Sequence, residues 1–132
     1  MSPIRMSKIE TAIRVVLAFY DALNREDIPG MMTCISADCS YESANGPDGV
    51  VYTGKEEIAQ FWRDYLHQHP NLQIKNEDVF GLGFRTIMRW RATWETEIGE
   101  KQSRRGVDIF QTENGLICKQ YSYVKGRKQF LD

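Results

Sequence analysis

The sequence has few of the residues from which metal and redox sites are usually built. Its 132 residues include three cysteines, with no CxxC spacing, and only two histidines, His67 and His69. An odd number of irregularly spaced cysteines is typical of a reduced, cytoplasmic protein rather than of a disulfide scaffold. Two histidines two residues apart on a helix point in different directions. We therefore expect no metal site and a cytoplasmic location.

Several functional motifs are also missing. The sequence has no GxSxG motif and no glycine-rich loop between a strand and a helix, which argues against a hydrolase triad and a dinucleotide site. No apolar run approaches the ~18 residues of a membrane span. The formal net charge is −1, from 17 basic and 18 acidic residues, so neither nucleic acid nor an anionic membrane is an expected partner. No cofactor is expected. With these sites excluded, acid–base catalysis is the kind of chemistry that the sequence leaves open.

The first half of the chain predicts helices. Apolar residues recur at helical spacing up to Leu23, and a short second helix is expected to follow a cap at Asp27 and to continue to Ile35. A third helix is expected to end before Pro70. A short strand over residues 39–43 precedes it. The length fits a single domain spanning residues 1–132.

The second half predicts antiparallel strands. Over residues 85–98, aromatic and apolar residues alternate with charged ones, which is typical of a sheet with one buried face. A return strand over 102–112, an Asn114-Gly115 turn and a last strand over 116–125 follow. This order predicts an α+β fold, in which a curved antiparallel sheet wraps around three N-terminal helices. Such a cone leaves a central pocket at its open end.

One carboxylate, Asp108, lies inside the apolar part of the return strand. Both faces of the strand are apolar there, so we expect Asp108 to be at least partly buried. Burial disfavours the charged form and raises the pKa of a carboxyl group. Asp108 is therefore the predicted catalytic residue, either as a general base or as a protonated donor to an oxyanion. The alternative is a structural acid paired with Arg89, Arg104 or a backbone N–H group.

Aromatic and amide side chains are expected to surround this acid. Trp90 and Trp94 point to the same side of one strand, and Gln120 lies on one side of the last strand. Plain core packing is the alternative for the aromatic residues. The predicted pocket-lining residues are Phe19, Tyr20, Tyr41, Phe61, Trp62, Trp90, Trp94, Phe110 and Gln120.

Three segments of the chain resemble the SnoaL-like group of the nuclear transport factor 2-like (NTF2-like) superfamily. They are residues 16–38, residues 52–61 with their Gly-x-x-x-Ile helix entry, and the final hairpin. The hairpin carries Arg105-Gly-Val-Asp-Ile-Phe110 and Tyr121-Ser-Tyr123. The resemblance implies a cone of sheet and helices with a central pocket, often dimeric through the sheet.

The resemblance also implies roles for single positions. In the related ketosteroid isomerases, the acid at the position of Asp108 belongs to the oxyanion-binding group, and in SnoaL-type polyketide cyclases an acid on a comparable strand is the base. The first-helix tyrosine of the isomerases falls on Phe19 here, with Tyr20 one residue further along. The isomerase base falls near Ser43 or Ala44, neither of which is an acid.

The expected function is the binding of a small, mostly apolar or aromatic molecule. The protein is expected to act on it as a cofactor-free enzyme of isomerase, cyclase or lyase type, with Asp108 moving a proton. The alternative is a non-catalytic ligand-binding or accessory domain whose buried acid is structural. A homodimer is also expected, because Ile87, Ile109 and Tyr121 would form an apolar patch on the outer face of the sheet.

Overall fold

The structure, a computed structural model, describes residues 3–125, with side chains from residue 10 onward. Residues 1–2 and 126–132 of the expected single domain lie outside this part. The helices are α1 (Pro3–Asn24), α2 (Ile28–Met32) and α3 (Lys55–Gln68). The strands are β1 (Ile35–Glu42), β2 (Val51–Thr53), β3 (Gln73–Leu82), β4 (Arg85–Glu95), β5 (Lys101–Glu113) and β6 (Leu116–Val124).

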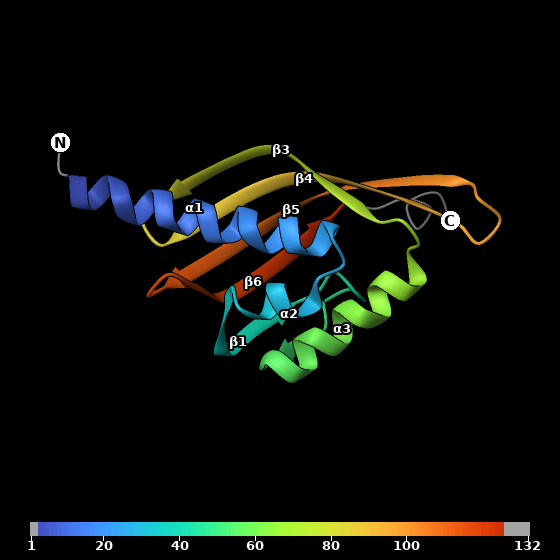
Figure 1. The fold of residues 1–132 in the computed structure, drawn as a ribbon, viewed down its shortest axis with the longest axis horizontal. Helices are drawn as coiled ribbons and strands as arrows, with labels where there is room; N and C mark the ends of the chain where they lie inside the picture. The colour runs from blue at the N-terminus through green and yellow to red at the C-terminus, as the bar shows by residue number, and fades with distance from the viewer. Residues whose placement is uncertain (1–2, 126–132) are drawn as a thin grey trace.

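The strands form one six-stranded curved sheet in the order β2-β1-β6-β5-β4-β3 (Figure 1). β3 to β6 are a continuous antiparallel meander, as the alternating sequence pattern predicts. β1 pairs with β6 in parallel, so the sheet is mixed rather than wholly antiparallel. β1 and β6 are far apart in the chain, so no short turn forces them to run antiparallel to each other. The predicted α+β fold is confirmed.

The start of β1 differs from the sequence prediction. The Asp27 side chain caps α2 as expected, accepting a hydrogen bond from the Gly30 backbone N–H at 2.9 Å. α2 then ends at Met32, and β1 begins at Ile35 instead of in the region of residue 39. Ile35 pairs with Ile117 of β6. This long-range pairing overrides the local helical pattern.

The core lies between the helices and the inner face of the sheet. In β4 every second residue from Thr86 to Trp94 is buried, and the same face of β5 buries Gly106, Asp108 and Phe110. α1 packs against β3, β4 and β6, while α3 packs against β1 and β2 (Figure 1). Within the described part, no helix combines the length and the apolar character that crossing a membrane requires.

Candidate active site

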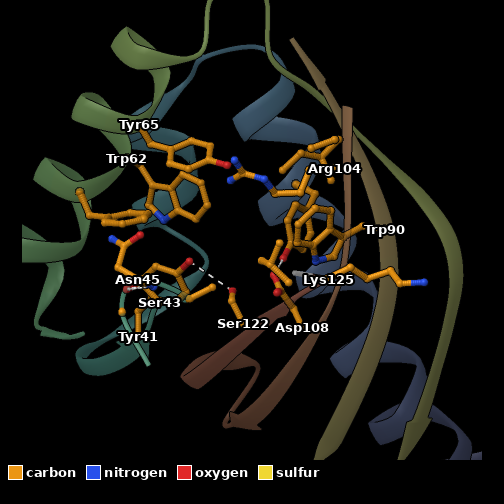
Figure 2. A pocket seen from close by; sticks show the side chains of 17 residues that line it. Tyr41, Ser43, Asn45, Trp62, Tyr65, Trp90, Arg104, Asp108, Ser122 and Lys125 are labelled. Atoms are coloured by element: carbon orange, nitrogen blue, oxygen red, sulfur yellow. Dashed lines mark hydrogen bonds between the residues drawn. The ribbon is translucent and has the colours of Figure 1, made fainter. Parts of the chain in front are cut away.

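A cavity of about 290 Å³ lies between the inner face of the sheet and helices α1 and α3 (Figure 2). Each of these elements contributes to its wall. Six residues that the sequence places at a pocket line it: Tyr20, Tyr41, Phe61, Trp62, Trp90 and Asp108. The cavity therefore brings the buried acid together with aromatic residues from α1, β1, α3 and β4.

Asp108 is held through one of its two carboxylate oxygens. The Tyr20 hydroxyl donates a hydrogen bond to Oδ2, and the Gln120 amide donates to the same atom at 3.1 Å. The other oxygen, Oδ1, is buried and has no hydrogen-bond partner among the described residues. Neither Arg89 nor Arg104 forms a salt bridge with Asp108 within 4.0 Å in this part of the chain. The predicted arginine pairing of a structural acid is therefore wrong.

Burial controls the charge of Asp108. The side chain is 3% exposed, and burial raises its pKa from 3.8 to about 7. The Ser122 hydroxyl and the Gln120 amide oppose this rise, because both stabilise the ionised carboxylate. Near neutral pH the group is present in both its acid and its base form, which is the condition a general acid–base catalyst needs.

The first-helix tyrosine that contacts the acid is Tyr20. The family resemblance places the corresponding position at Phe19, but Phe19 is fully buried and packs edge-on against Trp62 and Phe110. Tyr20 is the α1 residue that both lines the cavity and reaches Asp108. Asp108 therefore has a first-helix tyrosine partner, one position along the helix from the one that the resemblance implies.

Four predicted lining residues lie outside the cavity wall. Phe19 and Phe110 are fully buried in the core behind Tyr20, which stacks edge-on against both rings. Gln120 lies behind the acid and holds its Oδ2 atom. Trp94 packs near His69, at ring centroids 4.9 Å apart. Alternation along a strand determines the face of a side chain, but not whether neighbouring side chains separate it from the cavity.

The structure adds lining residues, both polar and apolar, to those predicted from the sequence. The cavity wall also contains Ser43, Ala44, Asn45, Gly46, Tyr65, Ile74, Ala92, Arg104, Ser122, Val124 and Lys125. The sequence held a signal for two of them. Arg104 lies four residues before Asp108 on one strand and so shares its face, and Tyr65 follows Phe61 by one helical turn. Asn45 and Gly46 belong to a loop whose path has no such periodicity.

Two further hydroxyl groups, those of Tyr41 and Ser122, lie near the acid. The Tyr41 hydroxyl lies 3.2 Å from the Ser122 Oγ atom, and Ser122 is paired directly across from Asp108 in the sheet (Figure 2). Burial strongly raises the pKa of Tyr41, so its hydroxyl stays protonated at neutral pH. Asp108 thus has a tyrosine hydroxyl on one side and a serine–tyrosine pair on the other.

Four cavity-lining residues carry a buried polar atom with no hydrogen-bond partner in the described part of the chain. Three are donors and one is an acceptor: Trp62 Nε1, Trp90 Nε1, Arg104 Nε and Asp108 Oδ1. A buried unpaired polar atom costs about 1–3 kcal/mol, so such atoms mark positions where a ligand would gain contacts. The aromatic sequence pattern predicts a mostly apolar ligand, but the cavity wall is of mixed polarity.

Trp90 occupies its place because the residue opposite it has no side chain. Gly106 pairs directly with Trp90 across β4 and β5. A Cβ atom on Gly106 would lie 2.4 Å from the Trp90 Cζ2 atom, which is shorter than van der Waals contact. Gly106 therefore lets the indole lie over β5, two residues away from the acid.

The two histidines lie outside the cavity wall. His69 stacks on Tyr65 with ring centroids 3.9 Å apart, and its Nδ1 atom lies 2.8 Å from the Tyr65 carbonyl oxygen. Burial lowers its pKa, against the opposing effect of that carbonyl. Over the residues that the structure describes, no group of three or more His, Cys, Asp or Glu side chains is arranged to hold a metal ion.

Solved structures with this fold have varied functions. A putative polyketide cyclase from Xanthomonas campestris pv. campestris is 19% identical, with a TM-score of 0.78 over 94% of this chain and 96% of that one. An LEH-like epoxide hydrolase from M. tuberculosis is 19% identical, with a TM-score of 0.75 over 89% of this chain and 84% of that one. At this identity the likeness shows the fold alone.

An NTF2-like protein of unknown function from Mesorhizobium loti is 28% identical, with a TM-score of 0.77 over 90% of this chain and 94% of that one. No protein of curated function matches the sequence. Residues 16–120 match the SnoaL-like domain family. The matched segment includes α2, α3, β1 to β5 and most of the candidate site, and the chain therefore belongs to the SnoaL-like family.

Proposed function

We propose that this protein is a cofactor-free acid–base enzyme that acts on a small organic molecule in the cavity. The observation that carries the proposal is the Asp108 carboxyl group. It is buried, lines the cavity and has a pKa of about 7. A carboxyl group with an ordinary pKa would be a weaker base. A carboxyl group with a pKa far above 7 would rarely be ionised at neutral pH.

The two oxygens of Asp108 would have different tasks. Tyr20 and Gln120 hold Oδ2, which fixes the orientation of the group, while Oδ1 has no partner among the described residues. In the proposed step, Oδ1 takes a proton from a carbon next to a carbonyl group and returns it at the same or a neighbouring position. Isomerisation and ring closure both begin with such a proton transfer.

Deuterium exchange tests this chemistry without a known substrate. Small aromatic ketones and 1,3-diketones are incubated with the protein in D2O, and NMR follows the loss of the proton next to the carbonyl. We expect exchange above the buffer rate for at least one compound, and loss of that excess in Asp108→Asn. The exposed variant Asp48→Asn is the matched control. Equal exchange by the wild type and Asp108→Asn would refute the proposal.

A non-catalytic ligand-binding domain is the second candidate. It is favoured by the observation that Asp108 is the only carboxylate among the described cavity-lining residues, so no second acid is at hand to complete a carboxylate pair. In that case Asp108 would hold Tyr20 and Gln120 in place. Binding of a compound with no exchange in any variant would support this function over the enzyme.

We also propose a cellular compartment and a ligand class for the protein. Cys34, Cys39 and Cys118 are free thiols, which suits a reducing, cytoplasmic compartment. The proposed ligand is a small aromatic molecule, because aromatic rings from four elements line the cavity beside its polar groups.

A further inference from the structure

The cavity contains a guanidinium group, that of Arg104, with no carboxylate partner among the described residues. Arg104 and Asp108 leave the same face of β5, four residues apart. On the opposite face, Arg105 and Arg91 both pair with Glu77, at 2.8 Å and 3.6 Å. Arg104 has no such partner within 4.0 Å in the described part of the chain.

Aromatic residues hold this guanidinium in place. Its central carbon lies 5.1 Å from the ring centre of Trp94, and the Tyr65 hydroxyl lies beside it. Figure 2 shows the Arg104 side chain reaching across the cavity toward Tyr65, while Asp108 lies on the other side. The Nε atom is buried without an acceptor among the described residues. An arginine packed on an aromatic ring keeps its planar N–H groups oriented for an anion with two oxygens.

Two acidic side chains that line a hollow with Arg104 have hydrogen-bond partners of their own. Glu57 and Asp64 line an adjoining hollow that shares Arg104 and Tyr65 with the cavity. Glu57 accepts a hydrogen bond from the Thr53 backbone N–H at 2.9 Å, and Asp64 accepts one from the Gln60 amide at 2.8 Å. Arg104 thus lies where the hollow meets the cavity, and its own charge remains available to a ligand.

We propose that Arg104 binds a carboxylate group of the substrate and so selects small aromatic acids. This inference rests on the proposed function only in placing the substrate in the same cavity. Two strand residues four apart are separated by roughly 13 Å along the backbone, so the carboxylate would lie at the opposite end of the ligand from Asp108. Lys125 is less suited to this task, since it is exposed and extends away from the cavity in Figure 2.

A pair of probes that differ only in charge tests the assignment. Isothermal titration calorimetry at pH 8 compares 2-naphthoate with methyl 2-naphthoate. We expect the wild type to bind the carboxylate at least about tenfold more tightly than the ester, as a hydrogen bond between charged groups predicts. Arg104→Gln should remove this preference while leaving ester binding within about twofold, and Arg104→Lys should retain part of it.

Further variants make the test decisive. Arg85→Gln, an exposed charge removal on the outer face of β4, should keep the full preference for the carboxylate. Thermal unfolding establishes that each variant is folded at the titration temperature, and Arg104→Lys reports on the charge if Arg104→Gln is unfolded. The proposal is overturned by a wild type without preference, by a preference that survives in folded Arg104→Gln, or by one lost instead in Lys125→Gln.

The outcome is separate from that of the exchange experiment. A carboxylate preference that depends on Arg104, with no deuterium exchange in any variant, refutes the enzyme and upholds the anion site. Exchange that depends on Asp108, with no preference between the two naphthalene probes, upholds the enzyme and refutes the anion site.

Discussion

The Tyr20 hydroxyl donates a hydrogen bond to the Asp108 carboxylate across the interface between α1 and β5. Both side chains are buried, and the two residues lie 88 positions apart in the chain. This contact joins the first helix to the strand that carries the acid. It also fixes which carboxylate oxygen is engaged and which one is buried without a partner among the described residues.

Removing the Tyr20 hydroxyl should raise the pKa of Asp108. A hydrogen bond to the ionised carboxylate stabilises that form, so Tyr20→Phe should move the pKa upward from about 7 by about one pH unit. NMR of the labelled Asp108 carboxyl carbon during a pH titration measures this directly. Tyr123→Phe, which removes an exposed hydroxyl, is the control. An unchanged or lower pKa in Tyr20→Phe would contradict the prediction.

The stability of the protein should fall as pH rises through neutrality because of Asp108. Its pKa is 3.8 when unfolded and about 7 when folded, so the folded state binds more protons between these values. The contribution of Asp108 to the free energy of unfolding is therefore full below about pH 4 and is lost as pH rises through about 7. His69, whose pKa is lowered, acts in the opposite direction, so a comparison with Asp108→Asn is needed.

Urea unfolding at about pH 5 and about pH 8 makes this comparison. The wild type should lose more stability between the two conditions than Asp108→Asn does, by an amount on the order of a few kcal/mol. Asp48→Asn, in an exposed loop, should behave as the wild type. Equal pH dependence in all three proteins would show that Asp108 is not perturbed.

Gly106→Ala should destabilise the protein and displace Trp90. The new Cβ atom would meet the Trp90 ring at 2.4 Å and the Tyr123 carbonyl oxygen at 2.7 Å. Overpacking of this kind costs about 1–3 kcal/mol. Denaturant unfolding measures the loss, and tryptophan fluorescence reports the ring movement. In a Trp90→Leu background the same substitution should cost less, and an equal cost would place the strain at the backbone contact alone.

We propose that the outer face of the sheet forms a homodimer interface. Ile87, Ile109 and Tyr121 are direct cross-strand neighbours in a row over β4, β5 and β6, and each is half-buried. Phe80 of β3, which pairs with Ile87, extends the row and is 53% exposed. Light scattering after gel filtration should give the mass of a dimer, and Ile109→Lys should give a monomer. A monomeric wild type would refute the proposal.

The local sequence pattern was sufficient for most of the fold. The alternation over β4 identified its buried face from Thr86 to Trp94, and the Asn114-Gly115 turn located the last hairpin. Asp108 was identified as a buried acid because both faces of its strand are apolar, and in the structure it is buried. These features depend on near neighbours along the chain, whose geometry the strand period fixes.

Contacts between distant segments decided the rest. Only the packing of α1 on the sheet made Tyr20, rather than Phe19, the partner of Asp108, since the two residues are adjacent on the helix and both are buried. Likewise β1 begins at Ile35 because β6 offers it a pairing partner. Arg104 was visible in sequence as sharing the face of Asp108, yet its direction toward Tyr65 depends on where α3 lies against the sheet. The sequence thus determined the acid and its strand, and the tertiary structure determined the groups that surround it, because those groups come from elements that no local period connects.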